Sequence, residues 1–327
     1  GTLFGIKNLQ PPLRLNLYPF TTGIINTVGD QASTDFKLGL DLKYGITDNL
    51  TLDATLIPDF SQARFDNVVL NIGPFEQTFA EQRQFFTEGI DLFTKGDLFF
   101  SRRVGNEPTG TLNLGRNEVA ENEPNNIDLL NAIKMSGRLK NGLGIGVFNA
   151  ITESTKAIAS DTLQNQTREQ VIEPLTNYSI LVVDQQFNRN SSVSLINTNV
   201  TRSGDFRNAN VTGALFDLIN NKNTYKVAGE FKMSHLNLQT DDKTGFSSAL
   251  EIAKISDQYQ LSLRYDYADK KYDINDLGLL LRNNFNNITA EASYRIFEPT
   301  SNFQTYRLTF ASLYKQLASP NTYTGLE

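Results

Sequence analysis

The stretch Tyr259-Gln260-Leu261-Ser262-Leu263-Arg264-Tyr265-Asp266-Tyr267 decides the fold. Its residues alternate strictly, with Tyr and Leu at the odd-numbered positions and Gln, Ser, Arg and Asp at the even-numbered ones. Successive side chains of a β-strand point to opposite faces of the sheet, so this pattern predicts a strand with one apolar and one polar face. Its length is also that of a tilted strand that crosses a bilayer.

The same alternation recurs along the chain, most clearly from Phe36, Tyr225, Ile288 and Tyr306. We predict fifteen strands, at residues 14–27, 34–46, 50–58, 97–104, 110–117, 131–139, 143–152, 177–187, 192–202, 209–219, 224–237, 246–256, 258–268, 285–297 and 303–316. Short and long connections alternate between them, as in outer-membrane barrels with short periplasmic turns and longer outer loops. A soluble sandwich, in which one face of each strand packs a core, stays open as the alternative, although its Greek-key connections need not keep this order.

Composition excludes several classes of protein. Among 327 residues there are 30 Lys plus Arg and 36 Asp plus Glu, with a net charge of −6 and no basic block, so binding to nucleic acid is not expected. The chain has no Cys, which excludes disulfides and thiol nucleophiles, and a single His, His235. No apolar run approaches the ~20 residues of a membrane-spanning helix. We expect no cofactor and no bound metal.

The strand count bears on how much of a barrel is present. Fifteen is an odd number, whereas bacterial single-chain barrels have an even number of strands. The residues from Ser319 onward offer no closing strand. We therefore expect residues 1–327 to form one transmembrane β-barrel domain that is an incomplete part of a larger barrel, with further strands in the natural sequence.

Two stretches resemble a known family. The first runs from Ile57-Pro58-Asp59-Phe60-Ser61-Gln62 through Phe75-Glu76 and Glu81-Gln82-Arg83-Gln84-Phe85-Phe86-Thr87-Glu88-Gly89 to Leu98-Phe99-Phe100-Ser101-Arg102-Arg103-Val104-Gly105. The second is Tyr272-Asp273-Ile274-Asn275-Asp276-Leu277-Gly278-Leu279-Leu280-Leu281-Arg282-Asn283-Asn284. Together they cover about a fifth of the chain. Both resemble the outer-membrane β-barrel family of Bacteroidota whose full-length members carry an N-terminal family-nine carbohydrate-binding-like domain. The resemblance implies a location in the bacterial outer membrane and an N-terminal domain that is absent from this chain.

The connection 59–96 is too long for an ordinary loop, and loops of this length are usually functional or disordered. Its phenylalanines give it enough apolar surface to fold on itself. We expect it either to plug the lumen, where Arg64, Glu81, Arg83 and Glu88 pair with charges on the wall, or to cap the barrel from outside.

The polar faces of the strands carry both signs of charge, which favours pairing between neighbouring strands over an ion-selective ring. Because adjacent residues of a strand point to opposite faces, one of Arg102 and Arg103 is expected to face the lumen. The candidate lumen or plug residues are Asp59, Arg64, Glu81, Arg83, Glu88, Arg102, Arg103, Arg264, Asp266, Asp276, Arg282 and Arg295.

These observations favour a non-enzymatic outer-membrane barrel that is either a solute channel or transporter, or a subunit of a larger outer-membrane complex. The expected partners are outer-membrane lipid, lipopolysaccharide, and outer-membrane proteins or lipoproteins. An outer-membrane enzyme acting on lipid or glycan is the competing class, but the sequence singles out no nucleophile or pair of acids. A soluble all-β carbohydrate-binding protein is a third possibility, which the absence of Trp disfavours.

Overall fold

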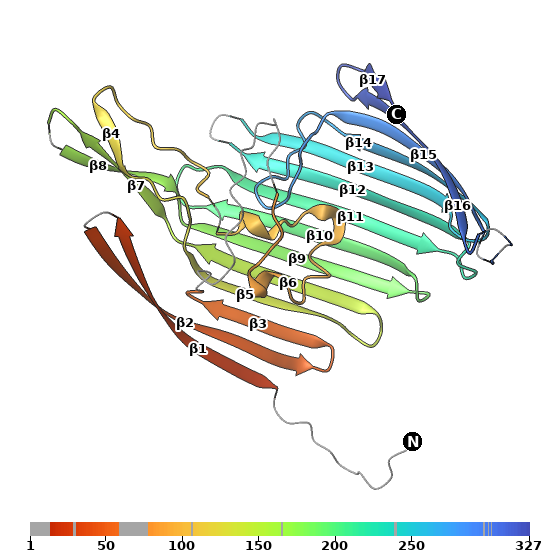
Figure 1. Ribbon diagram of the computed structural model, residues 1–327, viewed down its shortest axis with the longest axis horizontal. Helices are drawn as coiled ribbons and strands as arrows, with labels where there is room; N and C mark the ends of the chain where they lie inside the picture. The colour runs from red at the N-terminus through yellow and green to blue at the C-terminus, as the bar shows by residue number, and fades with distance from the viewer. Residues whose placement is uncertain are drawn as a thin grey trace, which may run out of the picture.

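The computed structural model describes residues 14–28, 31–58, 78–105, 107–164, 166–238, 241–296, 298–299, 301 and 303–327. Within these residues the chain is built of β-strands, all paired antiparallel, with three short 3-10 helices (Figure 1). No helix in these ranges is long and apolar enough to cross a membrane.

Fourteen strands form the main sheet, and each pairs with the next strand of that sheet along the chain. They are β1 (Leu15–Val28), β2 (Gln31–Thr47), β3 (Leu50–Leu56), β5 (Leu129–Arg138), β6 (Leu143–Thr152), β9 (Thr176–Phe187), β10 (Ser191–Arg202), β11 (Asn208–Ile219), β12 (Tyr225–Asn237), β13 (Lys243–Lys254), β14 (Tyr259–Ala268), β15 (Phe285–Ile296), β16 (Tyr306–Leu317) and β17 (Thr322–Leu326). In the described part of the chain β1 and β17 each pair on one side only, so the sheet is not closed.

A second sheet of three strands lies beyond one end of the main sheet (Figure 1). It consists of β4 (Glu118–Asn122), β7 (Thr155–Asp161) and β8 (Gln166–Glu173), in the order β4-β7-β8. All three strands come from the long connections that precede β5 and β9. The second sheet therefore lies at the end of the main sheet where the longest connections are found.

Thirteen of the fifteen predicted strands are confirmed, and the two at 97–104 and 110–117 are wrong. Residues 97–104 contain the 3-10 helix η3 (Ser101–Arg103), and at their start the positive φ of Gly96 (70°) and Asp97 (56°) turns the backbone out of an extended path. Residues 110–117 cross the second sheet, where Gln170 donates to the carbonyl of Thr111 at 2.9 Å. Because these two errors are consecutive, the longest connections, 57–128, 153–175 and 269–284, still fall at one end of the main sheet. The predicted alternation of short and long connections is not kept throughout, since the β1–β2 and β2–β3 connections are each two residues long.

No strand was predicted after residue 316, but a short one follows Ser319, which does not close the sheet. The short strand β17 returns as a hairpin and pairs with β16, for example Leu317 with Thr322. The main sheet thus has an even number of strands, so an odd count no longer argues that strands are missing. β4, β7 and β8 were not predicted either, since Ala, Ser and charged residues interrupt their alternation.

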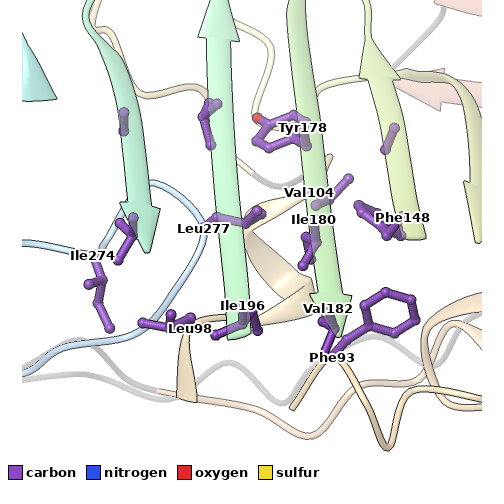
Figure 2. Close-up of a cluster of buried hydrophobic side chains, with 14 of the residues drawn as sticks. Phe93, Leu98, Val104, Phe148, Tyr178, Ile180, Val182, Ile196, Ile274 and Leu277 are labelled. Atoms are coloured by element: carbon purple, nitrogen blue, oxygen red, sulfur yellow. The ribbon is translucent and has the colours of Figure 1, made fainter. Parts of the chain in front are cut away.

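Residues 78–105, here called the inner segment, pack against one face of the main sheet, which we call the inner face; the opposite one is the outer face. The inner segment contains η1 (Gln84–Phe86), η2 (Lys95–Asp97) and η3. Figure 2 shows Phe93, Leu98 and Val104 of this segment among side chains of the sheet. The buried apolar cluster of the molecule lies here, between segment and sheet.

In a soluble sheet the apolar face is buried and the polar face is exposed, but β12 and β14 expose their apolar faces. On β12 the apolar Phe231 is 52% exposed and Met233 38%, whereas the neighbouring Lys232 is 7% exposed and Ser234 0%. On β14 Leu261 and Leu263 are likewise exposed. On these two strands the outer face is thus apolar and uncovered, and on β12 the polar side chains Lys232 and Ser234 are the covered ones.

Candidate functional site

The inner segment and the inner face together make the candidate site, and aromatic contacts hold its centre. Phe148 of β6 is surrounded by Phe86, Phe93 and Phe99, with ring centroids 6.1, 6.2 and 5.4 Å away. Phe148, Phe86 and Phe93 are buried. Aromatic pairs at such distances add about 0.5–1.5 kcal/mol each beyond the burial of their surface.

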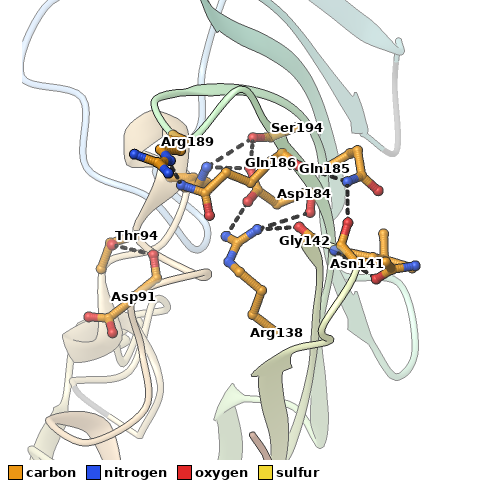
Figure 3. A network of polar contacts seen from close by, with 12 residues as sticks. Asp91, Thr94, Arg138, Asn141, Gly142, Asp184, Gln185, Gln186, Arg189 and Ser194 are labelled. Carbon is orange, nitrogen blue, oxygen red and sulfur yellow. Dashed lines mark hydrogen bonds and ion pairs between the residues drawn. The ribbon is translucent and has the colours of Figure 1, made fainter.

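Asp184 on β9 forms the first polar anchor of the segment. Its carboxylate is fully buried and forms ion pairs with Lys95 of the inner segment and Arg138 of β5. The Ser194 hydroxyl donates to the same carboxylate at 2.6 Å and accepts from Lys95 at 3.1 Å. Figure 3 shows Arg138 and Ser194 converging on Asp184. A buried carboxylate is tolerated when it is paired and hydrogen-bonded in this way.

Lys134 on β5 forms the second anchor. Its ammonium group is buried, donates to the backbone carbonyls of Phe85 and Glu88, and lies 3.7 Å from an oxygen of Asp53. Two residues further, Ser136 donates to the carbonyl of Gly89 at 2.8 Å. Lys134 and Ser136 bind backbone carbonyls of the inner segment, so they fix the path of the segment with little dependence on the segment's side chains.

Glu81, Arg83 and Ser101 brace the segment internally. Arg83 donates to Glu81 at 2.8 Å and to the carbonyls of Val104 and Ser101 at 2.6 and 2.9 Å. The Ser101 hydroxyl donates to Glu81 at 2.6 Å. Burial of Glu81 opposes its ionisation, but the hydrogen bonds and charge of Arg83 outweigh it and lower the pKa of this carboxyl to about 2.

The pKa of Glu81 predicts a pH dependence of stability. A lowered folded-state pKa stabilises the protein above the ordinary pKa of 4.5, and the contribution is lost as pH falls toward 2. At pH 7 the free energy of unfolding of the Glu81→Gln variant is expected to be lower than that of the wild type by up to about 3 kcal/mol. The difference should be the same at pH 5 and shrink below pH 4.5, as measured by denaturant titration in detergent. A difference that does not change with pH would contradict this.

Arg202 of β10 forms the third anchor, at the end of the sheet where the long connections lie. It donates to Asp276, in the connection between β14 and β15, at 2.8 Å and to Glu173 at 3.4 Å. Arg207 also pairs with Asp276, at 3.0 Å. Both carboxylates are almost fully buried. The network ties β8, β10 and the 269–284 connection together.

The structure brings some of the predicted site residues into contact with the segment or its anchors. Glu81 and Arg83 pair as described, and Glu88 pairs with Lys43 of β2 at 2.8 Å, whose hydrogen bond lowers the pKa of Glu88. Asp276 belongs to the third anchor. Asp59 and Arg64 lie outside the described residues.

Other predicted residues are placed elsewhere. Arg102 donates to the carbonyl of Ala80 and Arg103 to that of Gly278 at 3.2 Å; both stem from η3, so the expectation based on a strand is wrong. Arg264 and Asp266 pair with each other at 2.7 Å on the inner face of β14. Arg282 and Arg295 are exposed.

The site residues that the sequence did not reveal are Asp184, Lys95, Glu173 and Arg202. Asp184 follows Tyr178, Ile180 and Val182 on the same face of its strand, so one acid in a buried apolar row was the available signal. Its partner Lys95 is 89 residues away in the chain, a distance that no local pattern bridges.

A cavity of about 790 Å³ lies between β1–β3 and the inner segment. Its lining includes Asp41, Lys43, Asp53 and Lys134 from the sheet and Glu88 from the segment. In the described residues no group of three or more His, Cys, Asp or Glu side chains is arranged to hold a metal ion. The site is thus a polar space beside a packed, ion-paired segment.

Comparisons with known proteins add the following. The similar solved structures include a loop L8 deletion mutant of OmpT, an outer membrane protein of Vibrio cholerae, which is 10% identical, with 93% of this chain and 100% of that chain covered and a TM-score of 0.32. In-vitro folded OmpT from the same organism is 10% identical, with 92% and 97% covered and a TM-score of 0.31. Scores this low do not by themselves show a shared fold. No curated protein matches this sequence. A family model described as a domain of unknown function (DUF5916) matches residues 11–327, and the chain belongs to this family.

Proposed function

We propose that this chain forms the wall of a bacterial outer-membrane β-barrel, whose outer face contacts lipid and whose interior holds the inner segment. The barrel is non-enzymatic and serves as a gated solute channel or as a subunit of a larger outer-membrane complex. The observation that carries the proposal is the exposure of the apolar face together with the burial of the polar one, as on β12. Contiguous apolar surface of this kind marks a membrane or protein interface.

Aromatic residues support the same reading. At the short turns, Tyr225, Tyr259, Tyr294 and Tyr306 lie near the strand ends on the outer face, and the rings of Tyr259 and Tyr294 are 4.9 Å apart. Outer-membrane barrels carry such aromatic girdles at both borders of their apolar band. A soluble sandwich would need a second layer over the outer face, and no strand of the described residues lies there.

The proposal is tested with single spin labels, which the cysteine-free sequence makes simple to place. In the full chain refolded into phospholipid vesicles, labels at L261C and L263C are expected to collide more with oxygen, which dissolves in lipid, than with a water-soluble nickel chelate. Labels at S262C and R264C should show no such preference, because their side chains face inward. A label at L163C, exposed in the turn between β7 and β8, should favour the nickel chelate. Equal access of nickel to positions 261 and 163 would refute a membrane location.

A further inference from the structure

The outer face carries a set of neutral polar side chains that the proposed function does not use. We call them the amide ladder: Asn149, Asn177, Ser179, Asn197, Asn199, Thr201, Asn210 and Thr212, on β6, β9, β10 and β11. The inward neighbours of Asn177 and Ser179, namely Tyr178 and Ile180, are 2% exposed. The ladder therefore points outward, on the same side as the exposed Leu181.

The ladder is continuous across four strands. In the strand register Asn149 is opposite Ser179, Ser179 is opposite Asn199, and Asn199 is opposite Asn210. Hydrogen bonds join its members: Asn149 donates to Ser179 at 3.0 Å, and Asn210 donates to Asn199 at 3.2 Å. Asn197 donates to Thr212 at 2.8 Å and to Asn210 at 3.0 Å. Further bonds within the ladder and to nearby backbone carbonyls use the remaining amide donors of Asn149, Asn197 and Asn210. An amide oxygen has two lone pairs, so the capacity left for a ligand lies mainly in oxygen acceptors, which suit a donating hydroxyl group.

The position of the ladder along the strands suggests what lies beside it. Ser179 is eight residues from Phe187, where β9 meets its short turn, and Asn199 is eight residues from Ser191 on β10. On β14 eight residues separate Tyr259 from Tyr267, about 27 Å along the strand. For a tilted strand this approaches the height of the apolar band of outer-membrane barrels. The ladder thus lies at the outer border of that band.

The chemistry of the ladder selects among ligands. Its eight side chains carry no formal charge, so they suit hydroxyl groups better than phosphate, which is usually bound by Arg or Lys. It also lacks the aromatic and Arg residues that mark protein interfaces. Directly toward the short turns lie Leu181, Val183 and Leu195, which are exposed and apolar. The acyl chains of a lipid would cover these three side chains while the headgroup of the same lipid contacts the ladder.

We propose that the amide ladder binds the saccharide headgroup of an outer-leaflet glycolipid whose acyl chains lie on the apolar surface beneath it. The proposal rests on the proposed membrane location, with the long connections on the outer side. It assigns a lipid-binding role to uncharged residues on the outer face, whereas the inner segment and its anchors face the interior.

The test uses the full chain in vesicles that contain equal amounts of a lipooligosaccharide and a phosphatidylethanolamine. After mild detergent extraction, native mass spectrometry is expected to show retained lipooligosaccharide on the wild type. The Asn199→Leu/Asn210→Leu variant should retain roughly tenfold less, because hydrogen bonds to the sugar are lost. The Asn199→Thr/Asn210→Thr variant, which keeps hydrogen-bonding side chains, should retain it.

A matched control separates the ladder from a general effect of added leucines. Asn286→Leu/Ser312→Leu makes the same kind of change on the outer faces of β15 and β16 and should leave retention unchanged. Three results would overturn the glycolipid site. They are an equal loss of lipooligosaccharide from both leucine variants, retention of phosphatidylethanolamine equal to that of lipooligosaccharide on the wild type, and a second copy of the chain that is retained by the wild type but lost from the ladder variant. Flotation with the vesicles is measured before extraction, and a chain that does not float would overturn the membrane location itself.

Discussion

Replacing Arg202 with methionine is expected to lower the free energy of unfolding by about 3–5 kcal/mol, the range found when a buried ion pair loses one partner. The substitution removes the cation that pairs with Glu173 and one of the two that pair with Asp276. Both carboxylates are almost fully buried, so water cannot replace the lost charge. Denaturant titration of the refolded chain in detergent micelles measures the difference.

An exposed ion pair provides the control for this prediction. Lys156 and Glu169 of the second sheet are 2.7 Å apart, and both side chains are more than half exposed. The Lys156→Met variant should therefore change the free energy of unfolding by less than about 1 kcal/mol. If both variants cost the same, the third anchor does not stabilise the fold as described.

Replacing residues 84–99 with a Gly/Ser linker of equal length is expected to change the proposed barrel from electrically silent to conducting. The linker removes the rings that surround Phe148 and the Lys95 ion pair with Asp184, so the interior loses its packed filling. Water enters a polar interior from which side chains have been removed, and ions follow it. Single-channel recordings in planar bilayers should show discrete open events for the variant and none for the wild type.

The same recordings need a variant with altered loops and an intact inner segment. A Gly/Ser replacement of residues 220–223, in the short turn between β11 and β12, serves this purpose and should stay silent. Wild-type chains that conduct as well as the linker variant would contradict an occluding role for the inner segment.

Much of the main sheet was predictable because many of its strands, β12 and β14 among them, present one apolar and one polar face. The strand predicted at 143–152 has the same bounds in the structure, as β6. The inner segment shows where this logic fails. Phe99 and Val104 resemble a strand in composition, but their side chains pack onto the inner face, and the backbone before them turns at Gly96 and Asp97.

The candidate site was predictable in its location more than in its contacts. The unusual length and Phe content of the 59–96 connection directed attention to Glu81, Arg83 and Glu88, which do form ion pairs. Asp184 and Arg202 were missed because one charged residue on a strand does not reveal which distant segment will lie over it. Such pairing is a property of the assembled sheet.

One feature of the inner segment bears on the order in which the molecule assembles. Arg103 donates to the carbonyl of Gly278, 175 residues later in the chain, and Phe100 donates to that of Leu277. Contacts between parts so distant in sequence form late, because a long loop must close first. The inner segment is synthesised early, but its phenylalanine side chains stay exposed until most of the strands of the main sheet have formed.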